Sequence, residues 1–293
     1  MEQHTLSPLQ DKILEIFKEV KAILDRHHLR YFALGGTCIG AVRHRGFIPW
    51  DDDLDIVLPD KDYYRFLELA PKELPPYMAL YLSYEQRHRS SLEAKVHDMR
   101  TTFIEEAEIN HPEDYKGVFI DIFRMGGTPE DAKERAAFCR RFRNYKRLNE
   151  KRRTDFCHMQ QFRSKLLWVA ALPLRVLPYN FWSDKIMRMT DRYPYDEHSY
   201  VALTWEAKME KRLEKREEIY GETIELPFED TTIACPANYD KFLRDIFGDY
   251  MQLPPEEERV GLHITDGVID LEKPYAYYQE QFRCNGTIKK EPV

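Results

Sequence analysis

The chain has 293 residues, of which 43% are hydrophobic and 32% charged, a composition typical of a globular protein that buries a sizeable core. Its 44 basic and 51 acidic residues give a formal net charge of −7, which argues against nucleic-acid binding driven by overall charge. No run of about 18 apolar residues occurs, so no membrane-spanning helix is predicted, and the charged N-terminus does not resemble a signal peptide. Five scattered cysteines, none in a C-x-x-C pair, favour reduced thiols in a cytoplasmic protein.

The first half of the chain alternates between apolar runs and polar turns. A capping-box pattern at Ser7–Gln10, followed by apolar residues at helical spacing, predicts an amphipathic helix near the N-terminus. Shorter apolar runs, punctuated by glycine and proline, predict strands separated by helices. The predicted elements are helix 8–27, strand 31–34, helix 37–44, strand 54–58, helix 59–69 and strands 78–82, 91–98, 101–105 and 118–123.

The second half differs in pattern. The glycine pair Gly126-Gly127 is expected to end the mixed region, and a long helix is predicted over 130–153. The remainder is predicted to be mostly helical, with breaks at its prolines. The sequence thus predicts an α/β core over 1–128 and a mostly helical region over 129–293, arranged as two domains or as one continuous domain.

An acidic cluster within residues 50–58 is the most informative segment, because it places four carboxylates in five positions. Residues i and i+2 of a strand point to one face, about 6.6 Å apart, so Asp51, Asp53 and Asp55 would share a face if this segment is extended. Converging carboxylates suit a hard divalent cation such as Mg²⁺. The alternative is a solvated acidic loop that binds nothing.

A further carboxylate, Asp121, interrupts the apolar strand pattern of residues 118–123. A buried carboxylate without a partner is costly, so Asp121 should be protonated, salt-bridged or bound to a metal. We predict that it supplies a third metal ligand from a neighbouring strand. A structural salt bridge is the alternative.

A glycine pair, Gly35-Gly36, stands between a predicted strand and a predicted helix. Backbone amides at such a turn can approach a phosphate closely, and a helix N-terminus favours negative charge. The segment has neither a Walker A nor a G-x-G-x-x-G pattern, and a glycine pair alone is a weak signal. Its position shortly before the carboxylates, with Arg43 between, predicts one phosphoryl-transfer site with phosphate at the glycines and metal at the aspartates.

Four stretches of the chain resemble the LicD family, which is also similar to the fukutin-related proteins. They are residues 34–59 (LGGTCIGAVRHRGFIPWDDDLDIVLP), 94–106 (AKVHDMRTTFIEE), 117–127 (GVFIDIFRMGG) and 233–263 (IACPANYDKFLRDIFGDYMQLPPEEERVGLH). The family's core is similar to the nucleotidyltransferase fold, in which glycines precede an Asp-x-Asp and a later strand adds a third Asp. Cys235 and a single His263 depart from the family pattern, which leaves the acceptor contacts open.

The resemblance implies transfer of phosphocholine, or a similar phospho-alcohol, from a CDP-linked donor to a sugar hydroxyl of a cell-surface glycan, with release of CMP. It implies Mg²⁺ or Mn²⁺ as cofactor and no nucleic-acid partner. The implied metal ligands are Asp53, Asp55 and Asp121, and Asp51 is a further catalytic candidate. The expected donor-binding residues are Gly35, Gly36, Thr37, Arg43 and Lys95.

Two other functions stay open. One is a nucleotidyltransferase that uses a nucleoside triphosphate and releases pyrophosphate. The other is a non-catalytic module that binds metal or glycan. The aromatic candidates for holding a quaternary ammonium headgroup are Trp50, Tyr81, Tyr84 and Trp205.

A basic run covers residues 140–153, where eight of fourteen residues are Lys or Arg. An apolar stretch at 166–177, too short to span a membrane, follows it. These features indicate either a solvated helix face followed by a core segment, or a peripheral contact with the inner face of a membrane that carries a lipid-linked glycan acceptor.

Overall fold

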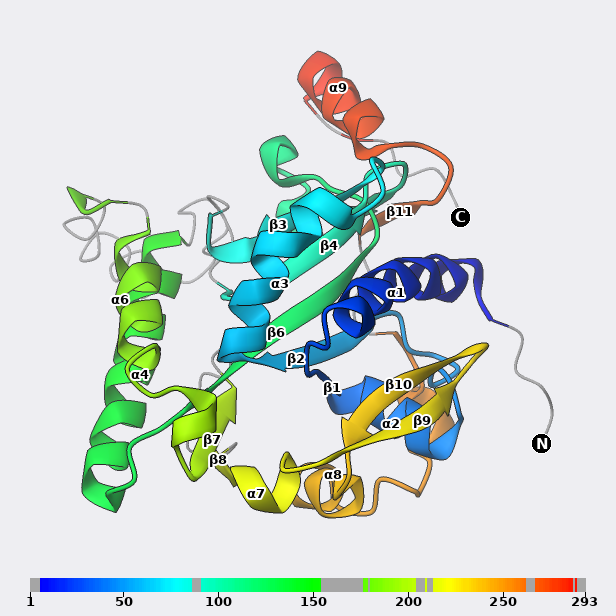
Figure 1. Ribbon diagram of the computed structural model, residues 1–293. Coiled ribbons are helices and arrows are strands. Elements are labelled where there is room, and N and C mark those ends of the chain that lie inside the picture. Colours follow the sequence, from blue (N-terminus) through cyan, green and yellow to red (C-terminus); the bar gives the residue numbers. More distant parts are fainter. Residues whose placement is uncertain are drawn as a thin grey trace.

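The computed structural model describes residues 6–85, 91–153, 176–178, 180–203, 209, 213–261, 267–286 and 288. The helices are α1 (Pro8–Arg26), α2 (Gly35–Arg43), α3 (Asp60–Glu73), α4 (Ala132–Arg153), α6 (Phe181–Thr190), α7 (Arg216–Ile219), α8 (Tyr239–Phe247) and α9 (Tyr275–Asn285). The strands are β1 (Phe32–Ala33), β2 (Asp55–Pro59), β3 (Met78–Leu82), β4 (Ala94–Asp98), β5 (Thr102–Ile104), β6 (Phe119–Gly127), β7 (Tyr200–Leu203), β8 (Leu213–Lys215), β9 (Thr223–Phe228), β10 (Thr231–Pro236) and β11 (Val268–Asp270). Together they form a mixed α/β architecture, as predicted (Figure 1).

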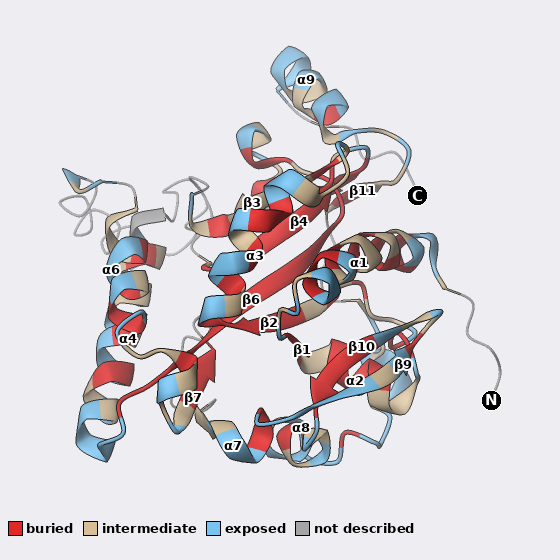
Figure 2. Ribbon diagram, in the orientation of Figure 1, coloured by how far each residue is buried: buried red, intermediate tan, exposed pale blue. Residues whose placement is uncertain are grey.

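The central element is a seven-stranded sheet in the order β1-β2-β6-β4-β3, with β7 paired to β6 and β8 paired to β7. Strands β2 and β6 are parallel, and the other pairs of this sheet are antiparallel. Strand β6 is nine residues long and buried throughout, and it runs through the middle of the molecule (Figure 2). Its last residues pair with β7, so the sheet continues past residue 128.

Helices α1 and α3 pack on one face of this sheet, where both contact β6 (Figure 1). Helix α1 begins with the predicted capping box, in which the Ser7 hydroxyl accepts from the Gln10 amide and the Gln10 side chain accepts from the Ser7 amide. Side chains alternate between the two faces of a strand. Arg124 of β6 donates a hydrogen bond to Tyr64 of α3, so its side chain lies on the face that the helices cover. Asp121 is three positions away on the same strand, so its side chain points to the opposite face.

The elements predicted for the first half are all present, with boundaries shifted by a few residues. One expectation is wrong: Gly126 and Gly127 extend β6 instead of ending the region, because they pair with β7. Helix α4 is confirmed, and the second half contains further helices but also strands β7 to β11, which were not predicted. Pro227 and Pro236, expected to break helices, lie in the β9–β10 hairpin, a two-stranded sheet where proline is tolerated.

Arg124 is a buried cation that joins three elements. It is 2% exposed and bonds Tyr64 of α3, Thr190 of α6 and the adjacent Asp191. We expect Asp191→Ala to lower the free energy of unfolding by about 1.5–3 kcal/mol, because the buried guanidinium loses its charged acceptor. Urea denaturation measures this change.

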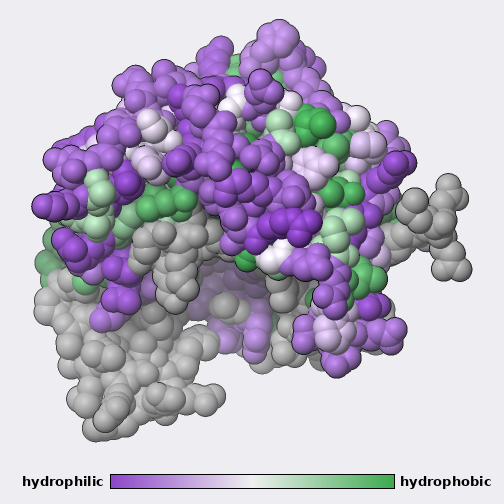
Figure 3. Space-filling view, turned by 90° about the horizontal axis from the view of Figure 1, so that it is seen from below, coloured by the Kyte–Doolittle hydropathy of each residue, from purple (hydrophilic) through white to green (hydrophobic). Residues whose placement is uncertain are grey.

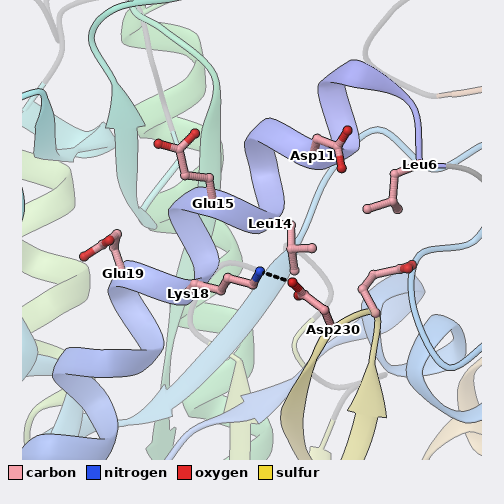
Figure 4. A pocket seen from close by; sticks show the side chains of 8 residues that line it. Leu6, Asp11, Leu14, Glu15, Lys18, Glu19 and Asp230 are labelled. Atoms are coloured by element: carbon pink, nitrogen blue, oxygen red, sulfur yellow. Dashed lines mark hydrogen bonds and ion pairs between the residues drawn. The ribbon is translucent and has the colours of Figure 1, made fainter.

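The matched control is Asp230→Ala, which removes an exposed ion pair. Asp230 lies 2.5 Å from Lys18 on the wall of a pocket between α1 and the β9–β10 hairpin, and its side chain is 65% exposed (Figure 4). Exposed pairs contribute about 0–1 kcal/mol, so this variant should unfold almost like the unsubstituted protein. Equal effects of the two substitutions would show that Arg124 does not depend on Asp191.

Candidate active site

The acidic cluster lies in the loop between α2 and β2. Strand β2 begins only at Asp55, so the strand face predicted for Asp51, Asp53 and Asp55 is wrong for the first two residues. The physical reason is a distant side chain. The side-chain Nε2 of Gln10 donates to the carbonyl oxygens of Ile48 at 3.1 Å and Asp51 at 2.9 Å, which holds this segment as a loop against the start of α1.

The loop nevertheless brings its carboxylates together. Asp51, Asp52 and Asp53 each offer an oxygen atom within 4.8 Å of the others. Asp52, which the predicted alternation excluded, is only 3% exposed. A Cβ atom at Gly261 would lie 2.6 Å from Asp52 Oδ2, so the C-terminal block of residues 233–261 reaches the acidic loop at a glycine.

Asp55 and Asp121 lie side by side on the face of the sheet opposite α1 and α3. They are register partners on the parallel strands β2 and β6, and directly paired residues share a face. Lys95 of β4 is the register partner of Asp121 on its other side, and its Nζ atom lies 2.7 Å from Asp121 Oδ1. The same Nζ atom lies 3.6 Å from the centre of the Phe119 ring. The predicted third carboxylate thus has a salt bridge and also lies beside Asp55.

Burial raises the pKa of both strand carboxylates. The pKa of Asp55 is raised well above its ordinary value by burial and then by the charges of Asp53 and Asp121. Burial raises the pKa of Asp121 to about 6, against the opposing charge of Lys95 and with a further contribution from Glu93. Ionised together, these groups repel one another, and a hard cation bound by their oxygen atoms would relieve that repulsion. The donor set therefore fits Mg²⁺ or Mn²⁺.

The predicted glycine turn forms the start of α2, directly beside the acidic loop. Gly35 has a φ of +52°, in the region that favours glycine, and a Cβ atom there would meet open space. A Cβ atom at Gly36 would lie 2.8 Å from Asp51 Oδ2. The Thr37 hydroxyl accepts a hydrogen bond from the Asp55 amide at 2.9 Å. The structure therefore assembles the glycine turn, the acidic loop and the start of β2 in one place.

A side chain at residue 36 should disturb this arrangement. We expect Gly36→Val to lower the affinity for a CDP-linked donor at least ten-fold, because the new side chain displaces Asp51 and fills the space beside the start of α2. Gly36→Ala, with a single methyl group, should have a smaller effect. Calorimetric titration with CDP-choline measures both. Unchanged binding by a folded Gly36→Val variant would remove the glycine turn from the donor site.

Arg43 lies at the other end of α2 from the glycines. Its guanidinium donates to the carbonyl oxygens of Tyr250 at 2.5 Å and Gln252 at 3.4 Å, and burial lowers its pKa. These contacts hold the C-terminal block against α2. Among the contacts described, none joins Arg43 to the aspartates, so its predicted role in donor binding stays a prediction.

Glu93 is a further carboxylate near Asp121 that the sequence analysis missed. It precedes β4, two residues before Lys95, and is 6% exposed. Its charge contributes to the raised pKa of Asp121, which places it near that group. The alternation of Glu93, Lys95 and His97 with apolar residues was a signal that could have revealed this polar strand face.

Comparisons with known proteins agree with this geometry. A family model described as "LicD/FKTN/FKRP, nucleotidyltransferase domain" matches residues 28–134. Over 279 residues the chain is 28% identical to the lipopolysaccharide cholinephosphotransferase LicD of Haemophilus influenzae, a match that covers 92% of this chain and 100% of that protein. Over 60 residues, 20% of its length, the chain also matches two uncharacterized proteins. It is 37% identical to one from Rickettsia typhi, of which the match covers 19%, and 35% identical to one from Rickettsia prowazekii, of which the match covers 23%. The region that matches this family model contains the glycine turn, the acidic loop and Asp121.

Proposed function

We propose that this protein is a phosphotransferase that moves phosphocholine, or a similar phospho-alcohol, from a CDP-linked donor to a sugar hydroxyl of a cell-surface glycan, releasing CMP. The observation that carries the proposal is the match over the whole length of a lipopolysaccharide cholinephosphotransferase. The site supports it, because the glycine turn and the carboxylates of two neighbouring strands lie together. The reaction would take place at the inner face of the membrane, where a lipid-linked glycan meets a cytoplasmic donor.

Asp53, Asp55 and Asp121 would hold Mg²⁺ or Mn²⁺. When bound, the cation would neutralise charge that develops on the departing CMP. The first turn of α2 would bind donor phosphate, because its backbone amides point out of a helix N-terminus and the glycines at 35 and 36 carry no side chain. Lys95 would keep Asp121 ionised by lowering its pKa.

The acceptor hydroxyl must lose a proton during transfer. Asp51 and Asp121 are the two candidate bases, and Asp51 is the better one, because Asp121 is already paired with Lys95 and is a proposed metal ligand. Trp50, next to this loop, is half-buried and lies beneath the Arg259 guanidinium, 5.5 Å from the ring centre. Because it directly precedes the acidic loop, it is our choice among the described aromatic candidates for contact with a headgroup.

A panel of CDP-alcohols tests the proposal. Purified protein would be incubated with CDP-choline, CDP-ethanolamine, CDP-glycerol or CDP-ribitol, a short soluble glycan and Mg²⁺. Release of CMP together with a phosphorylated glycan supports the proposal. Pyrophosphate release from a nucleoside triphosphate would instead indicate a nucleotidyltransferase, and metal binding without turnover of any donor would indicate a non-catalytic module.

A further inference from the structure

Helix α4 carries a straight strip of exposed cations. At about 100° per residue, the side chains of the strip fall within an arc of about 40°. The first and last of them are 18 positions apart in the chain, which corresponds to about 27 Å along the helix. The strip consists of Lys133, Arg140, Arg147 and Lys151, all exposed.

The opposite side of α4 is buried and fixes the orientation of the strip. Phe142 and Asn149 have no exposed surface, and the Ser183 hydroxyl of α6 donates to the Asn149 side chain at 3.4 Å. The Tyr145 ring lies against Trp182 of α6, with 5.5 Å between ring centres and an angle of 38° between the ring planes. Helices α4 and α6 stand side by side at the edge of the molecule, so the cationic strip faces outward (Figure 1). Arg143, which belongs to the same basic run, is half-buried on the flank of the helix.

The cations of the strip differ from other surface cations in their surroundings. Lys18, Lys241 and Arg244 each lie within 3 Å of a carboxylate oxygen, as is common on this acidic protein. No described residue forms an ion pair or side-chain hydrogen bond with any of the four strip side chains. Four uncompensated positive charges on one line, in a protein of net charge −7, favour an external anionic partner.

We propose that the strip docks α4 on an anionic membrane surface. A straight row of cations matches a flat sheet of phosphate headgroups, and each cation near such a surface strengthens binding about five-fold. Alanines and Asn144 lie between the cations, and no aromatic side chain of the strip is available to stack on a base, which disfavours single-stranded nucleic acid. The inference rests on the proposed function only in that a membrane-bound acceptor explains why such docking is useful.

The underside of the molecule, seen in Figure 3, is mostly hydrophilic with small separate hydrophobic patches. Val176 precedes α6, whose first turn packs beside the last turns of α4, and it is 86% exposed. An exposed apolar side chain at this end of the helix pair is compatible with a lipid interface. Among the described residues, no helix has the length and apolar character needed to cross a bilayer. Residues 166–175 of the predicted apolar stretch lie outside the described residues.

Vesicle co-sedimentation of the full chain tests the docking. The vesicles contain phosphatidylglycerol in phosphatidylcholine, or phosphatidylcholine alone. The strip variant carries Lys133→Gln, Arg140→Gln, Arg147→Gln and Lys151→Gln. The control variant has the same change in net charge at exposed cations of α1 and α3, namely Arg26→Gln, Lys61→Gln, Arg65→Gln and Lys72→Gln. We expect the unsubstituted protein and the control variant to bind vesicles that contain phosphatidylglycerol and not vesicles of phosphatidylcholine alone. The strip variant should bind the anionic vesicles at least a hundred-fold more weakly.

Salt and a nucleic-acid competitor complete the experiment. Raising the salt concentration towards 1 M should release the bound protein, because charges are then screened within about 3 Å. The docking proposal is overturned if anionic vesicles do not bind the unsubstituted protein at low salt, or if both variants bind equally. It is also overturned if single-stranded RNA binds the strip more tightly than the vesicles do. The assay contains no donor, so its outcome is independent of whether the protein transfers phosphocholine.

Discussion

Replacing Asp55 with Asn should abolish turnover, leave the protein folded and raise its melting temperature. Turnover should fall about a thousand-fold or more, because a metal ligand is lost and a bound cation contributes several kcal/mol to such reactions. The gain in stability follows from the raised pKa of Asp55. A carboxyl group whose pKa is higher in the folded than in the unfolded state destabilises the fold once it ionises at neutral pH. The neutral amide removes this cost.

Melting curves with and without Mg²⁺ separate loss of the metal from loss of the fold. Mg²⁺ should raise the melting temperature of the unsubstituted protein but not that of Asp55→Asn, and Asp53→Asn should behave in the same way. Asp60→Asn is the matched control, because Asp60 is also buried with a raised pKa but accepts from the Tyr195 amide on the helix-covered side. Near-normal turnover of Asp55→Asn with Mg²⁺ present would refute the metal assignment.

The strand that carries Asp55 and the strand that carries Asp121 could be predicted from sequence. Each is a short apolar run with one carboxylate, a pattern that requires burial and a partner for the charge. Their pairing could be proposed only as a neighbouring strand. The register that sets Asp55 directly beside Asp121 depends on the order of β2, β6 and β4 in the sheet, and local patterns do not contain that order.

The acidic loop illustrates what local patterns miss. Alternation along an extended segment selected Asp51 and Asp53 and passed over Asp52. The loop conformation depends instead on Gln10, whose side chain bonds the Asp51 carbonyl oxygen across 41 positions of the chain. Gln10 was recognised as a capping residue, and its side chain forms the cap and this loop contact at once. A long-range hydrogen bond of this kind leaves no periodic signal in the sequence.

The β9–β10 hairpin was missed for a different reason. Its first strand is largely exposed, so its residues show no buried apolar stripe. Its turn begins at Glu229, with a φ of +53°, a conformation more often filled by glycine or asparagine and therefore not signalled by this residue. Glu229 also accepts a hydrogen bond from the Phe47 amide, and that contact helps to hold the hairpin near the segment before the acidic loop.

Lys95 should also be needed for full turnover, although the sequence indicated only a cation that could neutralise phosphate. Its Nζ atom lies 2.7 Å from Asp121 Oδ1, and its charge opposes the rise in the pKa of Asp121 caused by burial. In Lys95→Met the pKa of Asp121 should rise further above about 6, so a smaller fraction of this carboxyl group is ionised at pH 7. We expect turnover at pH 7 to fall about ten-fold to a hundred-fold.

The pH profile distinguishes this positioning role from a structural one. Because an acid with a raised pKa ionises only at higher pH, the turnover of Lys95→Met should recover partly as pH increases, and Lys95→Arg should retain more activity than Lys95→Met at pH 7. Lys116→Met is the matched control, since Lys116 also lies over an aromatic ring, 5.0 Å from the centre of Tyr81, but donates to backbone carbonyl oxygens. An unshifted pH profile in Lys95→Met, with turnover lowered equally at every pH, would mean that Lys95 contacts donor phosphate or supports the fold and does not set the ionisation of Asp121.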